Sequence, residues 1–137
     1  MKKIVIGYDA SHEAERALAR AAELAQAFGA EVIVASISPA LVPAARGVGP
    51  YDPADPPEAH RAQAAAAAAK LAELGIAADR VTGVGDPGES LVALAREREA
   101  DLIVVGARDL SAFSRLFGAS VSDDVAHHAD CDVLIVH

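Results

Sequence analysis

The sequence contains no tryptophan and a single cysteine. The lone Cys131 excludes an intramolecular disulfide and leaves a cysteine-based zinc site without its ligands. No apolar run approaches the roughly 20 residues that a membrane-spanning helix needs, and residues 1–8 lack the apolar stretch and cleavage site of a signal peptide. We therefore expect a soluble, cytoplasmic protein without a metal site.

Basic side chains are also scarce. There are 12 Lys and Arg residues against 20 Asp and Glu residues, which gives a formal net charge of −8. A broad surface for nucleic acid or for an anionic membrane needs an excess of basic residues, so we expect neither partner. Any anionic ligand must be held by a local site.

Several catalytic motifs are missing as well. The chain has no Gly-x-Ser-x-Gly nucleophile elbow, no Walker P-loop and no Gly-x-Gly-x-x-Gly. A receiver domain would need an acidic pair after its first strand and a lysine after its fifth, where this chain has the single Asp9 and then His137. The sequence identifies no catalytic residue.

What the chain does contain is an alternation of short apolar runs and segments of helical periodicity. Strands are expected at residues 2–9, 31–37, 80–84, 101–105 and 132–137, and helices at 12–28, 58–74, from Gly88 to Arg98, and at 120–129. The run at 80–84 is the weakest and predicts a short edge strand. This pattern predicts one α/β domain over residues 1–137, a three-layer α/β/α sandwich with a five-stranded parallel sheet.

One segment interrupts the alternation. Residues 38–57 hold six of the seven prolines, which predicts an irregular excursion because each proline removes a backbone donor. Loops of this length are often functional lids, and Tyr51 would then close over a pocket. The alternative is a surface loop with no role.

Candidate site residues follow the strands. In an open parallel sheet, ligands bind beyond the carboxyl ends of the strands, where the strand order reverses. Asp9 follows the first strand and would accept a hydrogen bond from an adenine amino group or a ribose hydroxyl, or else cap a helix or form an Asx turn. Asp86 precedes a proline at a helix start, which favours a capping role.

The stretch from Gly106 to Ser122 predicts a strand-loop-helix turn. It has a glycine at the end of a strand and small hydroxyl-bearing residues where a helix begins. Backbone N–H groups at such a turn can bind a phosphate beside the positive end of the helix dipole. The alternative is an ordinary surface loop with glycines at its corners.

Taken together, these segments resemble the universal stress protein family. The likeness is carried, in order along the whole chain, by Gly7–Ser11, Gly85–Pro87, Asp101–Arg108, Ser120–Ser122 and Ala129–Val136. The resemblance implies a Rossmann-like sheet with strand order 3-2-1-4-5 and a homodimer. In one branch of the family, ATP is bound through a motif of Gly, two residues, Gly, nine residues, Gly, and Ser or Thr.

The resemblance also implies a set of site residues. Asp9 and the backbone at Ile37 would meet the adenosine, while Gly106, Ser120 and Val121 would meet the ribose and phosphates. The full candidate set is Tyr8, Asp9, Ile37, Gly106, Arg108, Asp109, Gly118, Ala119, Ser120, Val121 and Ser122.

Two positions depart from the family motif. Asp109 stands at the second glycine and Ala119 at the third, with Gly118 one position early. Asp109 would place a carboxylate on the phosphate loop, which Arg108 and Arg115 would offset. We expect a homodimer that binds ATP or AMP, with or without magnesium, and acts by conformation or association. The alternatives are a nucleotide-free scaffold of the same fold and a slow ATPase.

The last strand predicts the dimer interface. With the family's strand order, residues 132–137 form a sheet edge that carries four consecutive apolar residues, Val133–Val136. An uncovered apolar edge invites pairing, and a second copy related by a two-fold axis satisfies it.

Overall fold

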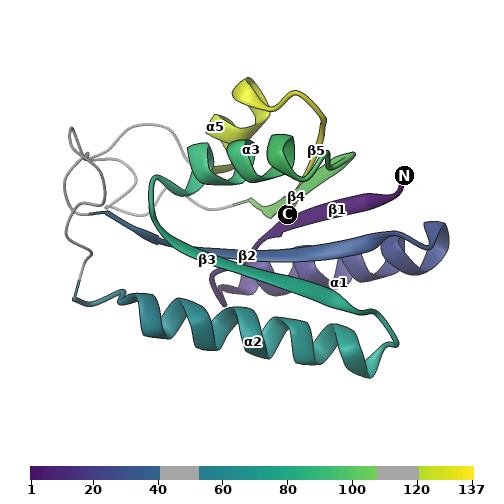
Figure 1. The fold of residues 1–137 in the computed structure, drawn as a ribbon, viewed down its shortest axis with the longest axis horizontal. Coiled ribbons are helices and arrows are strands. Elements are labelled where there is room, and N and C mark those ends of the chain that lie inside the picture. Colours follow the sequence, from purple (N-terminus) through teal and green to yellow (C-terminus); the bar gives the residue numbers. More distant parts are fainter. Residues whose placement is uncertain (41–52, 108–120) are drawn as a thin grey trace.

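The computed structural model describes residues 1–40, 53–107 and 121–137. Strands and helices alternate along the chain, as predicted (Figure 1). They are β1 (Lys3–Gly7), α1 (His12–Phe28), β2 (Glu31–Pro39), α2 (Pro57–Glu73), β3 (Ala78–Gly85), α3 (Pro87–Glu97), β4 (Leu102–Gly106), α5 (Val121–His128) and β5 (Asp132–Val136). Their ends differ from the predicted ends by a residue or two, a difference that is common at element boundaries.

The five strands form one parallel sheet in the order β3-β2-β1-β4-β5. Strand β1 is central, and its Val5 pairs with Ile33 of β2 on one side and with Ile103 of β4 on the other. These three residues are buried because both faces of the sheet are covered, which is why the central strands are uninterrupted apolar runs. The predicted fold class and strand order are confirmed.

Helices cover both faces of the sheet: α1 and α2 lie on one face, and α3 and α5 on the other (Figure 1). Successive strand residues point to opposite faces, so Ile4 and Ile6 of β1 pack under α1 and α2, whereas Val5 packs under α3 and α5. The buried side chains of Ala64 and Ala67 are small, which lets α2 lie close to the sheet.

Specific residues cap three of the helix ends. Ser11 caps α1, where its Oγ accepts a hydrogen bond from Ala14 N at 3.1 Å. Gly29 ends the same helix with a φ of 66°, in the left-handed region that glycine adopts without strain. Asp86 caps α3 and accepts from Glu89 N at 2.8 Å, so the capping role favoured for it is the one observed.

Strand β3 lies at the sheet edge, as predicted, but it is not short. It spans eight residues and pairs with β2 from Val32–Ala78 to Pro39–Gly85. An edge strand is only partly covered, and Thr82 and Gly83 are exposed. The apolar pattern is therefore weak, because hydrogen bonding to β2 extends this strand further than burial does.

The proline-rich segment is partly regular. Ser38 and Pro39 extend β2, and Pro57 begins α2 at a position where the missing N–H of proline costs nothing. Residues 41–52, which include Tyr51, lie outside the described residues.

Candidate functional site

The strand order reverses at β1, and there β2 runs further than β1. The ladder between them ends at the Gly7–Ala35 pair, after which Tyr8 N donates to Ala35 O at 2.9 Å. On its other side, β2 stays paired with β3 as far as Pro39. The last residues of β2 thus border the space beyond the end of β1, which we call the switch crevice. Crevices at this point of a parallel sheet are the usual ligand sites of the architecture.

The backbone of Ile37 faces the switch crevice. Along a strand of a parallel ladder, alternate residues direct their N–H and C=O to the same neighbour. The carbonyl of Ala35 accepts from β1, whereas Ala40 N donates to Gly85 O of β3 at 3.2 Å. Ile37 shares the direction of Ala35, so its N–H and C=O point toward the space where β1 has ended. A peptide donor and acceptor side by side suit the edge of a planar heterocycle.

Asp9 lies where the chain leaves β1 for α1. Its Oδ1 accepts from Ser11 N at 3.0 Å, and Ala10 between them has a φ of 62°. This turn reverses the chain tightly and holds the half-buried Asp9 side chain beside the start of α1. The turn role weighed for Asp9 is therefore observed, and the residue lies just beyond the end of β1, where the strand order reverses.

Gly106 ends β4 on the other side of β1, and the structure gives it a packing role. A Cβ at this position would lie 2.5 Å from the carbonyl carbon of Glu13 and 2.6 Å from its oxygen. Only a residue without a side chain lets β4 approach the first turn of α1 so closely. This reason for the glycine is independent of any phosphate.

Tyr8 is buried, with 4% of the residue exposed, in the apolar layer under α1 and α2. Its hydroxyl donates to Glu15 Oε1, which also accepts from Lys70 Nζ of α2 at 2.6 Å. Burial, and then the neighbouring Glu15 carboxylate, raise the pKa of Tyr8 above its ordinary value. The Lys70 and Tyr8 hydrogen bonds lower the pKa of Glu15.

The other candidate residues belong to the loop after β4 and to α5. Val121 is half-buried and Ser122 is buried in the first turn of α5. Arg108, Asp109, Gly118, Ala119 and Ser120 lie outside the described residues. The structure thus brings Asp9, Ile37 and Gly106 to the carboxyl ends of three adjacent strands.

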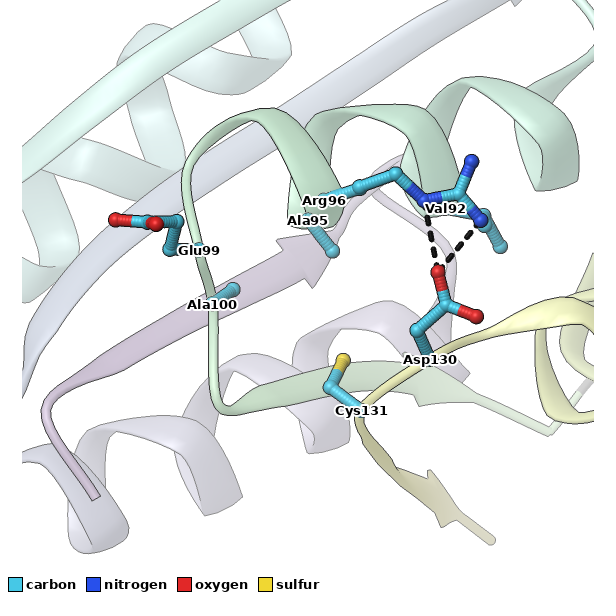
Figure 2. Close-up of a pocket in the computed structure, with 7 residues that line it drawn as sticks. All are labelled: Val92, Ala95, Arg96, Glu99, Ala100, Asp130 and Cys131. Carbon is cyan, nitrogen blue, oxygen red and sulfur yellow. Dashed lines mark hydrogen bonds and ion pairs between the residues drawn. The ribbon is translucent and has the colours of Figure 1, made fainter.

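A separate cavity of about 180 Å³ lies at the opposite end of the sheet, between α3 and the turn that leads into β5 (Figure 2). An ion pair between Arg96 and Asp130 crosses it at 2.5 Å. Cys131 lines it and packs against the cluster under α3. Burial raises the pKa of this thiol, which makes it a poor nucleophile.

Two features are absent from the described ranges. No helix there is long and apolar enough to cross a membrane. No group of three or more His, Cys, Asp or Glu side chains there could hold a metal ion.

Sequence reasoning missed a polar network beside the switch crevice. His60 of α2 has its Nδ1 2.6 Å from Ser36 Oγ and its Nε2 2.7 Å from Asp55 Oδ1. Ser38 Oγ donates to the backbone carbonyl of Asp55 at 2.6 Å. We call Ser36, Ser38, Asp55 and His60 the His60 network. Its sequence signal is faint: two serines alternate in a buried strand, and one histidine precedes an alanine run.

Comparison with known proteins assigns the family. The model of the universal stress protein family matches residues 1–137. The chain belongs to this family. The universal stress protein of Thermus aquaticus named for the 3′ region of a QAH/OAS sulfhydrylase is 37% identical over 136 residues, covering 98% of both chains. The match to universal stress protein Sll1388 of Synechocystis is 42% identical but spans only 64 residues, 42% of that relative.

Solved universal stress proteins share the fold. A crystal structure of a universal stress protein in complex with cAMP is 29% identical, with a TM-score of 0.76, and the match covers 99% of this chain and 97% of that one. The universal stress protein of Archaeoglobus fulgidus in complex with dAMP is 27% identical, with a TM-score of 0.77, and covers 100% and 98%. Both of those relatives were therefore captured with adenine nucleotides.

Proposed function

We propose that this universal stress protein binds an adenine nucleotide in the switch crevice. The observation that carries the proposal is the direction of the Ile37 N–H and C=O into the space beyond β1. The adenine nucleotides bound by two relatives of the same fold support it. AMP and ATP are the candidate ligands, because both present the same base to this backbone edge.

The base is recognised through its Watson–Crick edge. Adenine N1 accepts from the Ile37 N–H, and the adenine N6 amino group donates to the Ile37 carbonyl. Hypoxanthine reverses both groups, with a donor at N1 and an acceptor at O6. A mismatched polar group costs about 1–3 kcal/mol, and each 1.4 kcal/mol is about tenfold in affinity. IMP should therefore bind at least about tenfold more weakly than AMP.

Asp9 completes the nucleoside site in this proposal. Its carboxylate lies at the end of β1, next to the strand whose backbone reads the base. We assign it to a ribose hydroxyl or to the adenine amino group. The phosphates follow the stretch from Gly106 through Arg108, Asp109, Gly118, Ala119 and Ser120 to Val121 and Ser122, with or without a magnesium ion.

The protein is a single cytoplasmic domain of residues 1–137 that acts by conformation or association. It binds the ligand without turning it over, because the sequence contains no assignable general base. Repeated turnovers per minute in an ATPase assay would contradict it. A nucleotide-free scaffold is the competing function, and it predicts neither heat nor a thermal shift with millimolar AMP or ATP.

We further propose a homodimer through β5. Val133, Leu134, Ile135 and Val136 are all half-buried although the strand lies at the sheet edge. The opposite edge strand, β3, carries the exposed charges of Asp79 and Arg80 directly after its first residue, and these charges discourage pairing. A second copy paired on β5 would cover the apolar edge.

Two aspartate variants test the site. Asp9→Ala removes a turn acceptor and the proposed ligand contact. Asp86→Ala is the control, because it also removes an aspartate that accepts from a backbone N–H at a helix start, but two strands away from β1. Each should lose about 1 kcal/mol of folding free energy. By calorimetry only Asp9→Ala should weaken AMP binding, by about tenfold. Equal AMP affinities for the two variants would move the nucleoside away from Asp9.

A further inference from the structure

The His60 network is sealed inside the protein. His60 is 2% exposed, and Ser36 and Ser38 are fully buried. The Ser36 hydroxyl also reaches Gln63 Oε1 at 3.3 Å, and none of the buried side-chain N and O atoms in the described residues lacks a hydrogen-bond partner. The Ser-His-Asp composition is that of a hydrolytic triad. Because Ser36 is inaccessible, its oxygen cannot attack a substrate, so the network has another role.

The arrangement of the network points to that role. Ser36 and Ser38 lie on either side of Ile37 in the strand, and both side chains are turned toward α2. Ile37 turns its side chain to the opposite face, where its Cδ1 lies 3.8 Å from the Cβ position of Gly83. The network therefore holds β2 in place through Ser36 and Ser38, the residues immediately before and after Ile37.

These contacts hold the part of β2 that has a neighbouring strand on one side only. Past Gly7, β2 has lost its ladder to β1 and is paired only with the edge strand β3. Two serine side chains fix this end of β2 to the first turn of α2 and to Asp55 just before it. A buried, fully satisfied polar network is rigid and directional, whereas apolar packing alone would let the strand end shift.

We propose that the His60 network positions the Ile37 backbone for the adenine edge, with His60 as the positioning residue. The inference rests on the proposed nucleotide site. His60 does not touch the ligand; it sets the distance and direction of the peptide donor and acceptor that do. Loss of His60 should lower the discrimination between AMP and IMP. A more mobile Ile37 peptide can adjust to the reversed donor and acceptor of IMP and no longer rejects them.

Three substitutions divide the network. His60→Ala removes both contacts. His60→Asn retains an amide group near the position of Nδ1 to hydrogen-bond with Ser36 and loses the contact with Asp55, whereas His60→Gln retains an amide donor near the position of Nε2 for Asp55 and loses the contact with Ser36. Leu71→Ala, in the same helix and equally buried, is the matched control, because it removes packing under α2 without touching the network.

Two measurements on the full chain give the outcome. Calorimetry yields the ratio of the AMP and IMP affinities, and amide hydrogen exchange at Ser38 without nucleotide reports how firmly the end of β2 is held. We expect His60→Ala to lower the ratio at least fivefold and to speed exchange at Ser38 at least tenfold. His60→Asn should keep a higher ratio of AMP to IMP affinity and slower exchange at Ser38 than His60→Gln, because Ser36 directly links the network to the strand. Leu71→Ala should keep the wild-type ratio.

Failure of the inference is distinguishable from failure of the proposed function. If wild type discriminates AMP from IMP and His60→Ala keeps the full ratio, the positioning role is wrong and the nucleotide site stands. If Leu71→Ala lowers the ratio as much as His60→Ala does, general destabilisation explains the effect and the positioning role is again wrong. If wild type binds neither nucleotide, the proposed function and this inference both fall, whatever the exchange rates.

Discussion

Tyr8 carries a phenol hydroxyl into the apolar layer between the sheet and helices α1 and α2. Its hydrogen bond to Glu15, and the contact of Glu15 with Lys70, join the end of β1 to both helices. Protonation of Glu15 weakens this group of contacts, because its carboxylate form accepts the stronger hydrogen bonds. The strand end that leads into Asp9 is thus held by a charge-dependent contact.

Tyr8→Phe should cost about 1 kcal/mol of unfolding free energy near neutral pH. The pKa of Glu15 is lowered in the folded protein, so its contribution is present above the ordinary carboxyl pKa of about 4.3 and is lost as the pH falls through the folded value. The difference in unfolding free energy between wild type and Tyr8→Phe, measured by urea unfolding, should therefore become smaller in acid. A gap that stays constant from neutral pH into acid would show that Glu15 does not couple to Tyr8.

Gly106→Ala tests the packing role of this glycine. The added Cβ would meet the Glu13 backbone at 2.5 Å, so α1 or β4 must move, at a cost of about 1–3 kcal/mol. Gly83→Ala is the control, since its nearest neighbour is 3.8 Å away and its cost should stay within about 0.5 kcal/mol. Equal thermal stabilities for the two variants would exclude the close approach to Glu13.

At the scale of the element, the ladder of β5 suggests a clean test of the dimer. Val136 O accepts from Ala107 N at 2.7 Å, so Val136 and, two residues earlier, Leu134 direct their backbone groups to β4. Val133 and Ile135 direct theirs to the open edge. A partner strand would use these outward groups.

Ile135→Pro should therefore dissociate the dimer and leave the fold intact, because it deletes only an outward donor. Leu134→Pro deletes a donor to β4 and should unfold or precipitate the protein. Light scattering should show twice the chain mass of 14.0 kDa for wild type and a single chain mass for a folded Ile135→Pro. A folded Ile135→Pro that remains dimeric would place the interface elsewhere.

The loop after β4 carries its own prediction, from sequence spacing alone. A carboxylate about 4 Å from a phosphate charge costs roughly 1–4 kcal/mol, depending on the effective dielectric. Asp109→Gly should then tighten ATP about tenfold or more, with a smaller gain for AMP. A magnesium ion bridging Asp109 and the phosphates would reverse the sign for ATP. Unchanged affinities for both nucleotides, with and without magnesium, would mean that the phosphates bind elsewhere.

How far the sequence predicts an element depends on what forms it. β1, β2 and β4 were predictable because strands that are buried on both faces have uninterrupted apolar sequences. The full length of β3 was not, because cross-strand hydrogen bonds leave no composition signal at exposed residues such as Thr82. In the site, Asp9 and Ile37 follow from the strand-end rule and the family resemblance. His60 does not, since only the packing of α2 brings it to Ser36 and Asp55.

At the scale of the whole molecule, charge works against the proposed ligand. A chain with a formal charge of −8 repels an anionic nucleotide at long range. Recognition must therefore come from contacts at short range, and the backbone N–H and C=O of Ile37 point into the switch crevice. The base, rather than the phosphate, should set the specificity.

Titration calorimetry of AMP and IMP against the wild-type protein tests this account most directly. The two ligands share ribose and phosphate and differ only in the edge that faces Ile37, so any difference in affinity belongs to the base. The account predicts measurable AMP binding and at least about tenfold weaker IMP binding. Equal affinities for the two nucleotides, or no binding of either at millimolar concentration, would contradict it.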